Sequence, residues 1–481
     1  MKLLHVVLAS TIFAAALAAQ TQAPDRSKPP ALGPAPQVKL PAIQKRRLSN
    51  GLPVWIVETH KVPVVQVNLV VLTGSADDPA GKYGVASLAD AMLQDGAGAR
   101  TSLEIADAID FLGADITTGS AIDSAAVRLH TTAARLADAL PIMADVALRP
   151  TFPKDELERI RQQRLNSLVR ARDDADTTAQ LAFARVVFGT AHRFGTATMG
   201  TSETIKAFTT DDLHAYYAAT FRPENATLLV VGDVTPDKAL ALLETSFGKW
   251  KAPAGPATPR VRLPAPPARS TRGIYIVDKP GAAQSQIRIG AVGVARSTPD
   301  YFPILVMNTV LGGSYSSKLN MNLREKHGYT YGANSTFDMR VSEGPFVATA
   351  GVQTDKTADA LKEFFNELNA IREPVTAEEL ARAKNYVSLR FPERFETTGD
   401  ISTRLEDLLV YHLPDDYYST YVRNIQAVTA ADVQHVAQKY IQPDRLAVVV
   451  VGDQRVIEPA IRALGLGPIT VITSDEIFGP R

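Results

Sequence analysis

The 481-residue chain contains no cysteine. This absence excludes disulfide bonds, thiolate zinc sites, thiol nucleophiles and the attachment of a lipid to cysteine. The chain also has no excess of charge of one sign, because 51 Lys and Arg residues balance 51 Asp and Glu residues. A balanced chain has no global electrostatic reason to bind nucleic acid or an anionic membrane, so we expect neither as a partner.

Long apolar runs are missing except at the amino terminus. Residues 3–19 are apolar and follow Lys2, and residues 16–18 and 17–19 both fit a small-x-small cleavage site. This pattern predicts a signal peptide over residues 1–19 and an exported, periplasmic protein with no stable membrane insertion after cleavage. An uncleaved anchor is the alternative. Residues 20–42 are rich in proline and predict an extended tether.

The sequence repeats itself on the two sides of a proline-rich stretch. Residues 228–233 (LLVVGD) match residues 448–453 (VVVVGD). Three pairs of matching residues are each separated by 220 positions: Gln66 and Gln286, Pro223 and Pro443, and Asp233 and Asp453. A constant offset at separated places indicates two homologous domains. We predict these domains over residues 43–250 and 273–470, joined by a proline-rich linker over residues 251–272.

The same order of elements is expected in both halves. Strands and helices mix without strict alternation, which predicts an α+β fold in which each domain has a largely antiparallel sheet packed with helices. The matching elements are strands over 62–72 and 285–294, short helices over 84–94 and 301–311, and longer helices over 154–170 and 377–390.

Common catalytic motifs are missing. Residues 312–316 read GGSYS and fail the last position of the G-x-S-x-G nucleophile elbow. Lys82 follows a glycine but precedes Tyr83, so there is no P-loop. None of the eight histidines lies within four residues of another. Because a helical zinc site needs two imidazoles on one face, we expect no metal in this chain.

Two stretches resemble the insulinase or pitrilysin-like zinc peptidases, which carry an inverted H-x-x-E-H motif. One reads GSADDP at 74–79 and GVASLADAM at 84–92. The other reads LGGSYSSKL at 311–319 and NLREKHGYTYG at 322–332. The resemblance extends from about residue 43 to about residue 453, including the duplication and the linker. It implies two homologous domains that close as a clamshell around a peptide.

The resemblance also implies that the first half has lost its zinc motif. The family's two histidines and its glutamate fall here on Ser87, Ala91 and Asp90, respectively. The family's third ligand, a glutamate on the next long helix, falls near Asn166 and Ser167. Alanine offers no ligand atom and serine a poor one, so these degenerate positions predict a hydrolytically inactive half without zinc.

The second half keeps an arginine and a tyrosine seven residues apart, Arg324 and Tyr331, as the family does. A guanidinium can hold a peptide carbonyl or carboxylate, and a phenol can donate to an oxyanion. The alternative is a surface arginine beside a packed tyrosine. Two interpretations are open for Gly312, Gly313 and Ser314. They form either a flexible glycine loop near the substrate or the C-cap of a helix and the turn that follows it.

The resemblance therefore predicts a non-catalytic, substrate-binding subunit of an exported heterodimeric zinc metallopeptidase. Its partner would be a homologous H-x-x-E-H subunit that holds the zinc, and hydrolysis of the peptide substrate would occur only in the complex. One alternative is an inert scaffold or peptide-holding protein of the same fold with no peptidase partner. Another is an active peptidase with substitute metal ligands, which predicts stoichiometric zinc in the purified chain.

Overall fold

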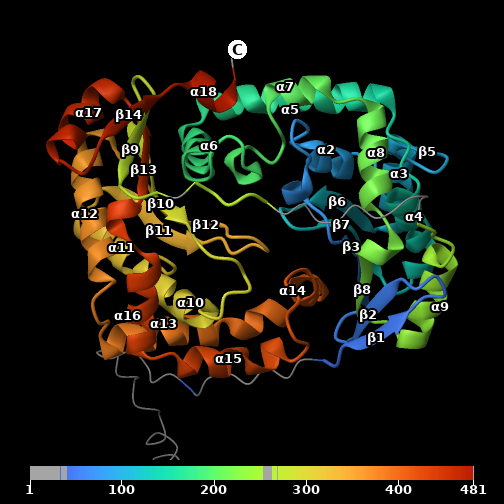
Figure 1. Ribbon diagram of the computed structural model, residues 1–481. Coiled ribbons are helices and arrows are strands. Elements are labelled where there is room, and N and C mark those ends of the chain that lie inside the picture. Colours follow the sequence, from blue (N-terminus) through green and yellow to red (C-terminus); the bar gives the residue numbers. More distant parts are fainter. Residues whose placement is uncertain (1–32, 34–40, 253–262, 268, 480–481) are drawn as a thin grey trace, which may run out of the picture. The chain divides into compact units, whose positions relative to one another are not determined.

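The computed structural model describes residues 33, 41–252, 263–267 and 269–479 (Figure 1). The predicted signal peptide lies outside these residues, as do most of the tether and residues 253–262 and 268 of the linker. The linker residues that are described, 251–252, 263–267 and 269–272, form no helix or strand. The predicted domain boundaries remain predictions.

The first sheet has six strands in the order β1-β2-β8-β3-β7-β6. Only β2 and β8 pair in parallel, and every other neighbouring pair is antiparallel. The strands are β1 (Gln44–Arg47), β2 (Pro53–Glu58), β3 (Val64–Val71), β6 (Asp115–Ser120), β7 (Ala125–Thr132) and β8 (Ala226–Gly232). A separate short pair consists of β4 (Gly96–Ala97) and β5 (Arg100–Thr101).

The second sheet has the order β11-β12-β10-β13-β9-β14, in which the first five strands correspond to β6-β7-β3-β8-β2 of the first sheet. The sixth strands differ, because β1 precedes the other strands of its sheet in the chain and β14 follows those of its own. The strands are β9 (Gly273–Asp278), β10 (Gln284–Val292), β11 (Thr330–Phe337), β12 (Pro345–Gln353), β13 (Ala447–Gly452) and β14 (Ile469–Ile472). Here β9 pairs in parallel with both β13 and β14. Strands β9 and β10 begin 220 residues after β2 and β3, the same offset as in the sequence. The predicted α+β fold with two homologous, largely antiparallel sheets is confirmed, with parallel pairs at one side of each.

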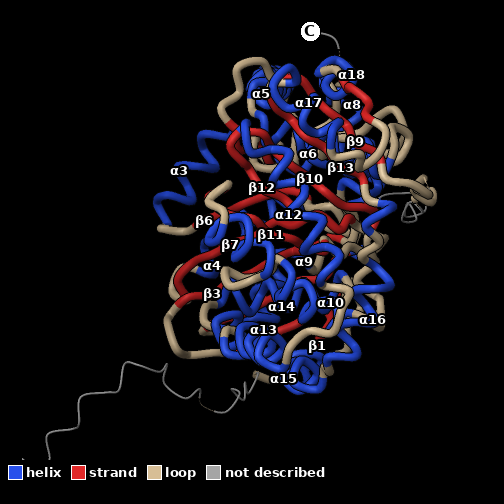
Figure 2. The backbone as a smooth tube through the Cα atoms, turned by 90° about the vertical axis from the view of Figure 1, so that its left-hand side faces the viewer, coloured by secondary structure: helices blue, strands red, loops and turns tan. Residues whose placement is uncertain are grey.

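Helices cover both sheets. The first half contains α2 (Val85–Ala91), α3 (Ser102–Leu112), α4 (Leu136–Leu148), α5 (Lys154–Asp173), α6 (Ala175–Phe188), α7 (Ser202–Ala207), α8 (Thr210–Thr220) and α9 (Pro236–Phe247). The second contains α10 (Tyr301–Leu311), α11 (Lys318–Asn320), the π-helix η4 (Met321–Lys326), α12 (Thr357–Ala370), α13 (Ala377–Leu389), α14 (Thr398–Val410), α15 (Tyr417–Ala427), α16 (Ala430–Tyr440), α17 (Gln454–Ala463) and α18 (Ser474–Phe478). Figure 2 shows α12 in front of the strands of the second sheet, against which it packs.

The repeat extends to the helix caps. Thr209 and Asp212 form a capping box at the start of α8, in which the threonine hydroxyl accepts a hydrogen bond from the Asp212 amide at 3.3 Å. Thr429 and Asp432 form the same box at the start of α16. A capping box satisfies backbone donors that a helix leaves unpaired, so the local sequence fixes where both helices begin.

Two helices are exchanged between the halves. Helix α6 of the first half packs on β10 and β13, whereas α14 of the second half packs on β3 and β8. Figure 1 shows both helices between the two sheets. Successive strand residues point to opposite faces, so Leu228 and Val230 of β8 enter the core of the first half, while Leu229 and Val231 join that of the second. The described residues between 41 and 479 accordingly belong to one compact unit.

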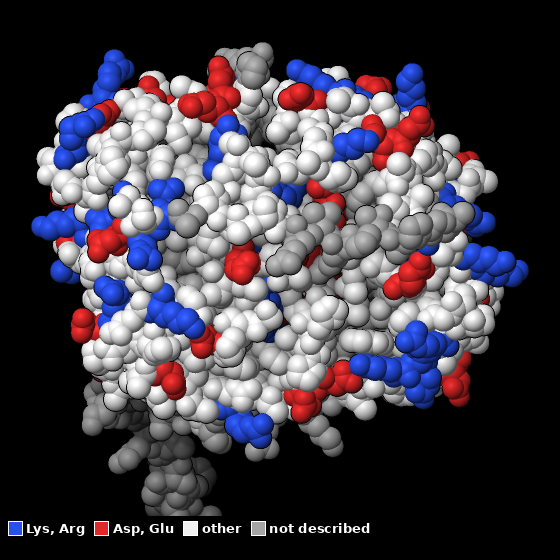
Figure 3. Space-filling view, viewed as in Figure 1, with Lys and Arg blue, Asp and Glu red and all other residues white. Residues whose placement is uncertain are grey.

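Acidic and basic side chains are interspersed on the face seen in Figure 3. Within the described part of the chain, none of the helices combines the length and the apolar character needed to cross a membrane.

Candidate functional site

The first candidate site is built around α2, and we call it the α2 site. A buried carboxylate, Asp78, holds the start of this helix. It accepts hydrogen bonds from the backbone amides of Gly84 at 2.7 Å and Ala86 at 2.9 Å. Arg193 donates to the same carboxylate at 2.8 Å, and both side chains are almost fully buried. Burial raises the pKa of Asp78, and the Arg193 charge opposes that rise. The ion pair therefore fixes the position of α2.

Gly84 is required where the chain enters α2. Its φ of 102° lies in the left-handed region, and an added Cβ would lie 2.4 Å from the carbonyl oxygen of Met199. Only glycine tolerates both constraints at low cost. The segment around Met199 is thereby brought directly against the beginning of α2.

The three degenerate positions Ser87, Asp90 and Ala91 all lie on α2. Asp90 is fully buried, and the Tyr216 hydroxyl of α8 donates to its Oδ2 at 3.3 Å. Its Oδ1 has no hydrogen-bond partner among the described residues. Burial holds the pKa of Asp90 well above its usual value. A buried carboxyl that favours its protonated form is poorly suited to activate water as a general base.

A cation lies beside these positions. Arg164 of α5 donates from Nη2 to the backbone carbonyl of Ser87 at 2.6 Å and from Nη1 to that of Met199 at 3.5 Å. Burial lowers the pKa of Arg164 to about 10, while the nearby Asp78 charge raises it. The guanidinium is therefore charged at neutral pH, inside the site.

The residues of the α2 site do not fit a zinc ion. Among the described residues no group of three or more His, Asp or Glu side chains could hold a metal. Asn166 is exposed, and the Ser167 hydroxyl donates back to the carbonyl of Gln163 at 2.9 Å. With one buried carboxyl and an adjacent guanidinium, the donor set lacks the three ligands of a catalytic zinc centre.

The second candidate site carries Arg324 on η4 and Tyr331 on β11, and we call it the Arg–Tyr surface. The Arg324 side chain is 40% exposed, with its Nε 3.3 Å from Oε1 of Glu325. Its guanidinium lies over the Tyr315 ring, 5.0 Å from the centroid. The Tyr315 hydroxyl donates to the same Glu325 oxygen at 2.7 Å. Tyr331 is 88% exposed on the edge strand of the second sheet. Both side chains are open to a partner molecule.

The predicted glycine loop is tightly packed. Gly312 caps α10, and an added Cβ would lie 2.3 Å from the backbone nitrogen of Ser335 on β11. Gly313 donates its amide to the carbonyl of Asn308 at 2.7 Å. Ser314 donates to the carbonyl of Thr309 at 3.1 Å. These contacts account for the two glycines by close approach of the backbone, and a role in substrate binding remains a prediction.

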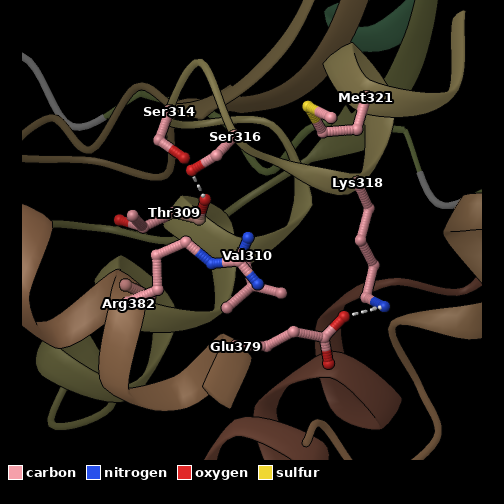
Figure 4. A pocket seen from close by; sticks show the side chains of 9 residues that line it. Thr309, Val310, Ser314, Ser316, Lys318, Met321, Glu379 and Arg382 are labelled. Atoms are coloured by element: carbon pink, nitrogen blue, oxygen red, sulfur yellow. Dashed lines mark hydrogen bonds and ion pairs between the residues drawn. The ribbon is translucent and has the colours of Figure 1, made fainter. Parts of the chain in front are cut away.

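A pocket of about 220 Å³ lies beside this turn (Figure 4). Ser314 and Ser316 line one side of it, and Lys318 forms an ion pair with Glu379 on the other. Arg382 also lines the pocket, so the lining carries a guanidinium in addition to the Lys318–Glu379 ion pair.

Sequence reasoning missed the polar groups that surround α2. Arg161 and Arg164 share the inward face of α5 with Leu157 and Leu168. The spacing of these four residues along the helix is the only sequence signal that could have placed the two arginines on that face. Asp78, Arg193 and Tyr216 come from distant segments and carry no local signal. In the described part of the chain no hydrogen bond or ion pair joins Arg324 or Tyr331 to α2.

Two family models match the chain. The model described as insulinase (peptidase family M16) matches residues 54–204, and the one described as peptidase M16 inactive domain matches residues 207–387. An uncharacterized zinc protease of Mycobacterium leprae is 28% identical over 66% of this chain and 70% of its own length. An uncharacterized zinc protease of Mycobacterium tuberculosis is 24% identical over 85% of this chain and 93% of its own.

Solved structures share the fold. The crystal structure of a peptidase M16 inactive domain from Pseudomonas fluorescens has a TM-score of 0.79 and 27% identity, covering 85% of this chain and 98% of the other. A protease from Helicobacter pylori has a TM-score of 0.78 and 22% identity, covering 86% and 100%. The second likeness concerns the fold alone.

Proposed function

Because the chain belongs to the insulinase family of peptidases, family M16, we propose that it is the non-catalytic, substrate-binding subunit of an exported heterodimeric zinc metallopeptidase. Its partner is a homologous H-x-x-E-H subunit that holds the zinc. The zinc of that subunit activates the attacking water when bound. This chain supplies Arg324 and Tyr331 to the shared active site.

The observation that carries the proposal is the contrast between the two candidate sites. At the α2 site the carboxyl of Asp90 is buried, and Arg164 contributes a positive charge. At the Arg–Tyr surface, by contrast, Arg324 and Tyr331 are exposed. A chain that keeps binding groups without a working metal centre fits a subunit that holds substrate and leaves hydrolysis to its partner.

Each side chain has a definite task. The Arg324 guanidinium offers a planar fork of donors that holds a carbonyl or a terminal carboxylate of the peptide. To do so it exchanges its contact with Glu325, which costs little because the pair is half-exposed. The Tyr331 hydroxyl donates to the oxyanion that forms on the scissile carbonyl.

The test is peptide hydrolysis by this chain co-purified with an H-x-x-E-H subunit. We expect Arg324→Ala and Tyr331→Phe each to lower kcat/KM by about 30- to 1000-fold, equivalent to about 2–4 kcal/mol of lost transition-state stabilisation. The matched controls are Arg390→Ala and Tyr386→Phe. Tyr386 lies on α13, Arg390 directly follows that helix, and the Arg390 guanidinium donates to the Tyr386 hydroxyl. These controls should leave kcat/KM unchanged.

The same preparation separates the alternatives. Chelator-sensitive hydrolysis and stoichiometric zinc in the chain alone would mean that it is an active peptidase. If kcat/KM of the complex is unaffected by both substitutions, or if no peptidase subunit co-purifies, the inert scaffold is the better account. Recovery of mature chain in the periplasmic fraction, starting near residue 19 or 20, tests export.

A further inference from the structure

Arg164 occupies an unusual place for a charged side chain. It lies on the inward face of α5, between Arg161 and Leu168, and its guanidinium reaches α2. The contact at 2.6 Å is made with the backbone carbonyl of Ser87, the first degenerate position. A second, longer contact reaches the Met199 carbonyl. The side chain thus links α5 to α2 and to the segment around Met199. A metal ion with ligands on α2 and α5 would hold the same two helices together.

The geometry of α2 explains why there is room for the guanidinium. Residues four apart on a helix lie on the same face, so Ser87 and Ala91 are neighbours one turn apart. The Ser87 carbonyl points along the helix toward Ala91. An imidazole at position 91 would extend over this carbonyl, whereas the alanine methyl leaves the carbonyl open to Arg164.

Among the described residues no carboxylate forms an ion pair with Arg164, whose hydrogen bonds go to two backbone carbonyls. Asp78, whose charge acts on Arg164, is already paired with Arg193 at 2.8 Å and hydrogen-bonded to two backbone amides. Asp90 is fully buried, and burial disfavours its charged form. The set of Asp78, Arg193 and Arg164 therefore carries a net positive charge, which repels a divalent cation.

We propose that the Arg164 guanidinium takes the place of a metal ion in this half of the molecule, by bridging α5 to α2 and by excluding divalent cations from the α2 site. Missing ligands are then one of two reasons why this half binds no zinc. The other is that a cation belonging to the chain itself, the Arg164 guanidinium, lies where the metal would bind. This inference concerns the chain alone and is independent of any partner subunit.

The decisive experiment restores the ligands with and without Arg164. The restored chain carries Ser87→His, Asp90→Glu, Ala91→His and Ser167→Glu, since Ser167 lies one turn beyond Arg164 on α5. A second version adds Arg164→Met. A matched control adds Arg170→Met instead, because Arg170 lies on the same helix, is exposed and donates from its side chain to Ser167 rather than to α2. Zinc content after dialysis and the visible spectrum of bound Co²⁺ are measured.

We expect stoichiometric zinc and a tetrahedral Co²⁺ spectrum only with Arg164→Met. Its zinc affinity should exceed that of the other two chains by at least about 100-fold, the upper end of what groups around a ligand set contribute. Equal zinc affinity in all three chains would overturn the proposal. Absence of zinc from all three would do so as well, because Arg164 would then not be what excludes the metal.

A second measurement needs only one substitution and so avoids dependence on the fourfold variant. In the otherwise unmodified chain, Arg164→Met should speed amide hydrogen exchange in α2 by about tenfold or more, since a bridge to a part-buried backbone carbonyl is lost. Arg170→Met should leave exchange in α2 unchanged. If Arg164→Met also leaves α2 exchange unchanged, Arg164 does not bridge the two helices.

Discussion

At the scale of single residues, Asp90 shows how a position can keep an acidic side chain without its chemistry. It occupies the position of the family's catalytic glutamate, but its carboxyl is fully buried. Among the described residues the carboxyl accepts a side-chain hydrogen bond only from the Tyr216 hydroxyl. Burial raises its pKa well above the ordinary value. The buried carboxyl therefore lowers the free energy of unfolding at pH values where the same carboxyl is ionised in the unfolded chain.

The expected consequence is a pH-dependent stability that Asp90→Asn removes. The folded chain binds a proton at Asp90 that the unfolded chain releases near pH 4, so stability falls as pH rises from there through the folded-state pKa. The slope for one such group is at most about 1.4 kcal/mol per pH unit. Asp90→Asn should therefore match the parent near pH 4 and exceed its stability at pH 7 and above, as measured by urea unfolding.

The control for this prediction is Asp110→Asn on the exposed face of α3. It should change the free energy of unfolding by no more than about 0.5 kcal/mol at any pH. Parallel stability curves for Asp90→Asn and the parent would show that Asp90 titrates normally.

At the scale of elements, the π-helix η4 sets the position of Arg324. Asn322, two residues earlier, is buried and donates from Nδ2 to Glu363 at 3.0 Å and to Glu367 at 2.5 Å, both on α12. His327, at the end of the same turn, places its Nε2 4.0 Å from Glu363. The π-turn is thus tied to α12 on both sides of Arg324, and short π-segments of this kind often occur at functional sites.

Asn322→Ala should therefore lower the peptidase activity of the complex, although Asn322 itself does not contact the substrate. A displacement of about 1 Å can cost up to about 100-fold, so we expect kcat/KM to fall by roughly 10- to 100-fold. Because Asn322 acts through Arg324, the loss should vanish in an Arg324→Ala background. An equal loss in both backgrounds would instead indicate general destabilisation.

At the scale of the whole molecule, the two halves are joined by the exchange of α6 and α14. The α14 contact is polar at its centre. Glu406 accepts from Arg128 at 2.8 Å and from Asn68 at 2.6 Å, and both donors belong to the first sheet. Glu406 is 12% exposed at its side chain, so water replaces these bonds poorly. The halves therefore depend on each other for stability.

Glu406→Ala tests this dependence. It leaves the buried amide of Asn68 without one of its acceptors and removes the partner of the Arg128 charge. Hydrogen bonds to charged groups contribute roughly 1.5–3 kcal/mol each, so we expect a loss of about 2–4 kcal/mol in the free energy of unfolding. Glu393→Ala removes only an exposed ion pair with Arg390 and should cost about 0–1 kcal/mol. Similar losses in the two variants would contradict the proposed coupling.

The sequence by itself determined the elements and their duplication. The 220-residue offset between Asp233 and Asp453 recurs in the strands, the caps and the sheet order, because each half follows the same local signals of turn, cap and apolar period. It also determined which ligand types are missing at Ser87, Asp90 and Ala91, since chemistry depends on side-chain identity.

Only the tertiary structure decided what replaced them and how the halves combine. Arg164 lies 77 residues from Ser87, and Arg193 lies 115 residues from Asp78, so no local pattern relates them. Likewise α6 has the apolar character of any core helix, and nothing in its sequence tells which sheet it covers. Contacts of this kind form when distant segments are buried together, and their charge and hydrogen bonding are set by that burial rather than by neighbours along the chain.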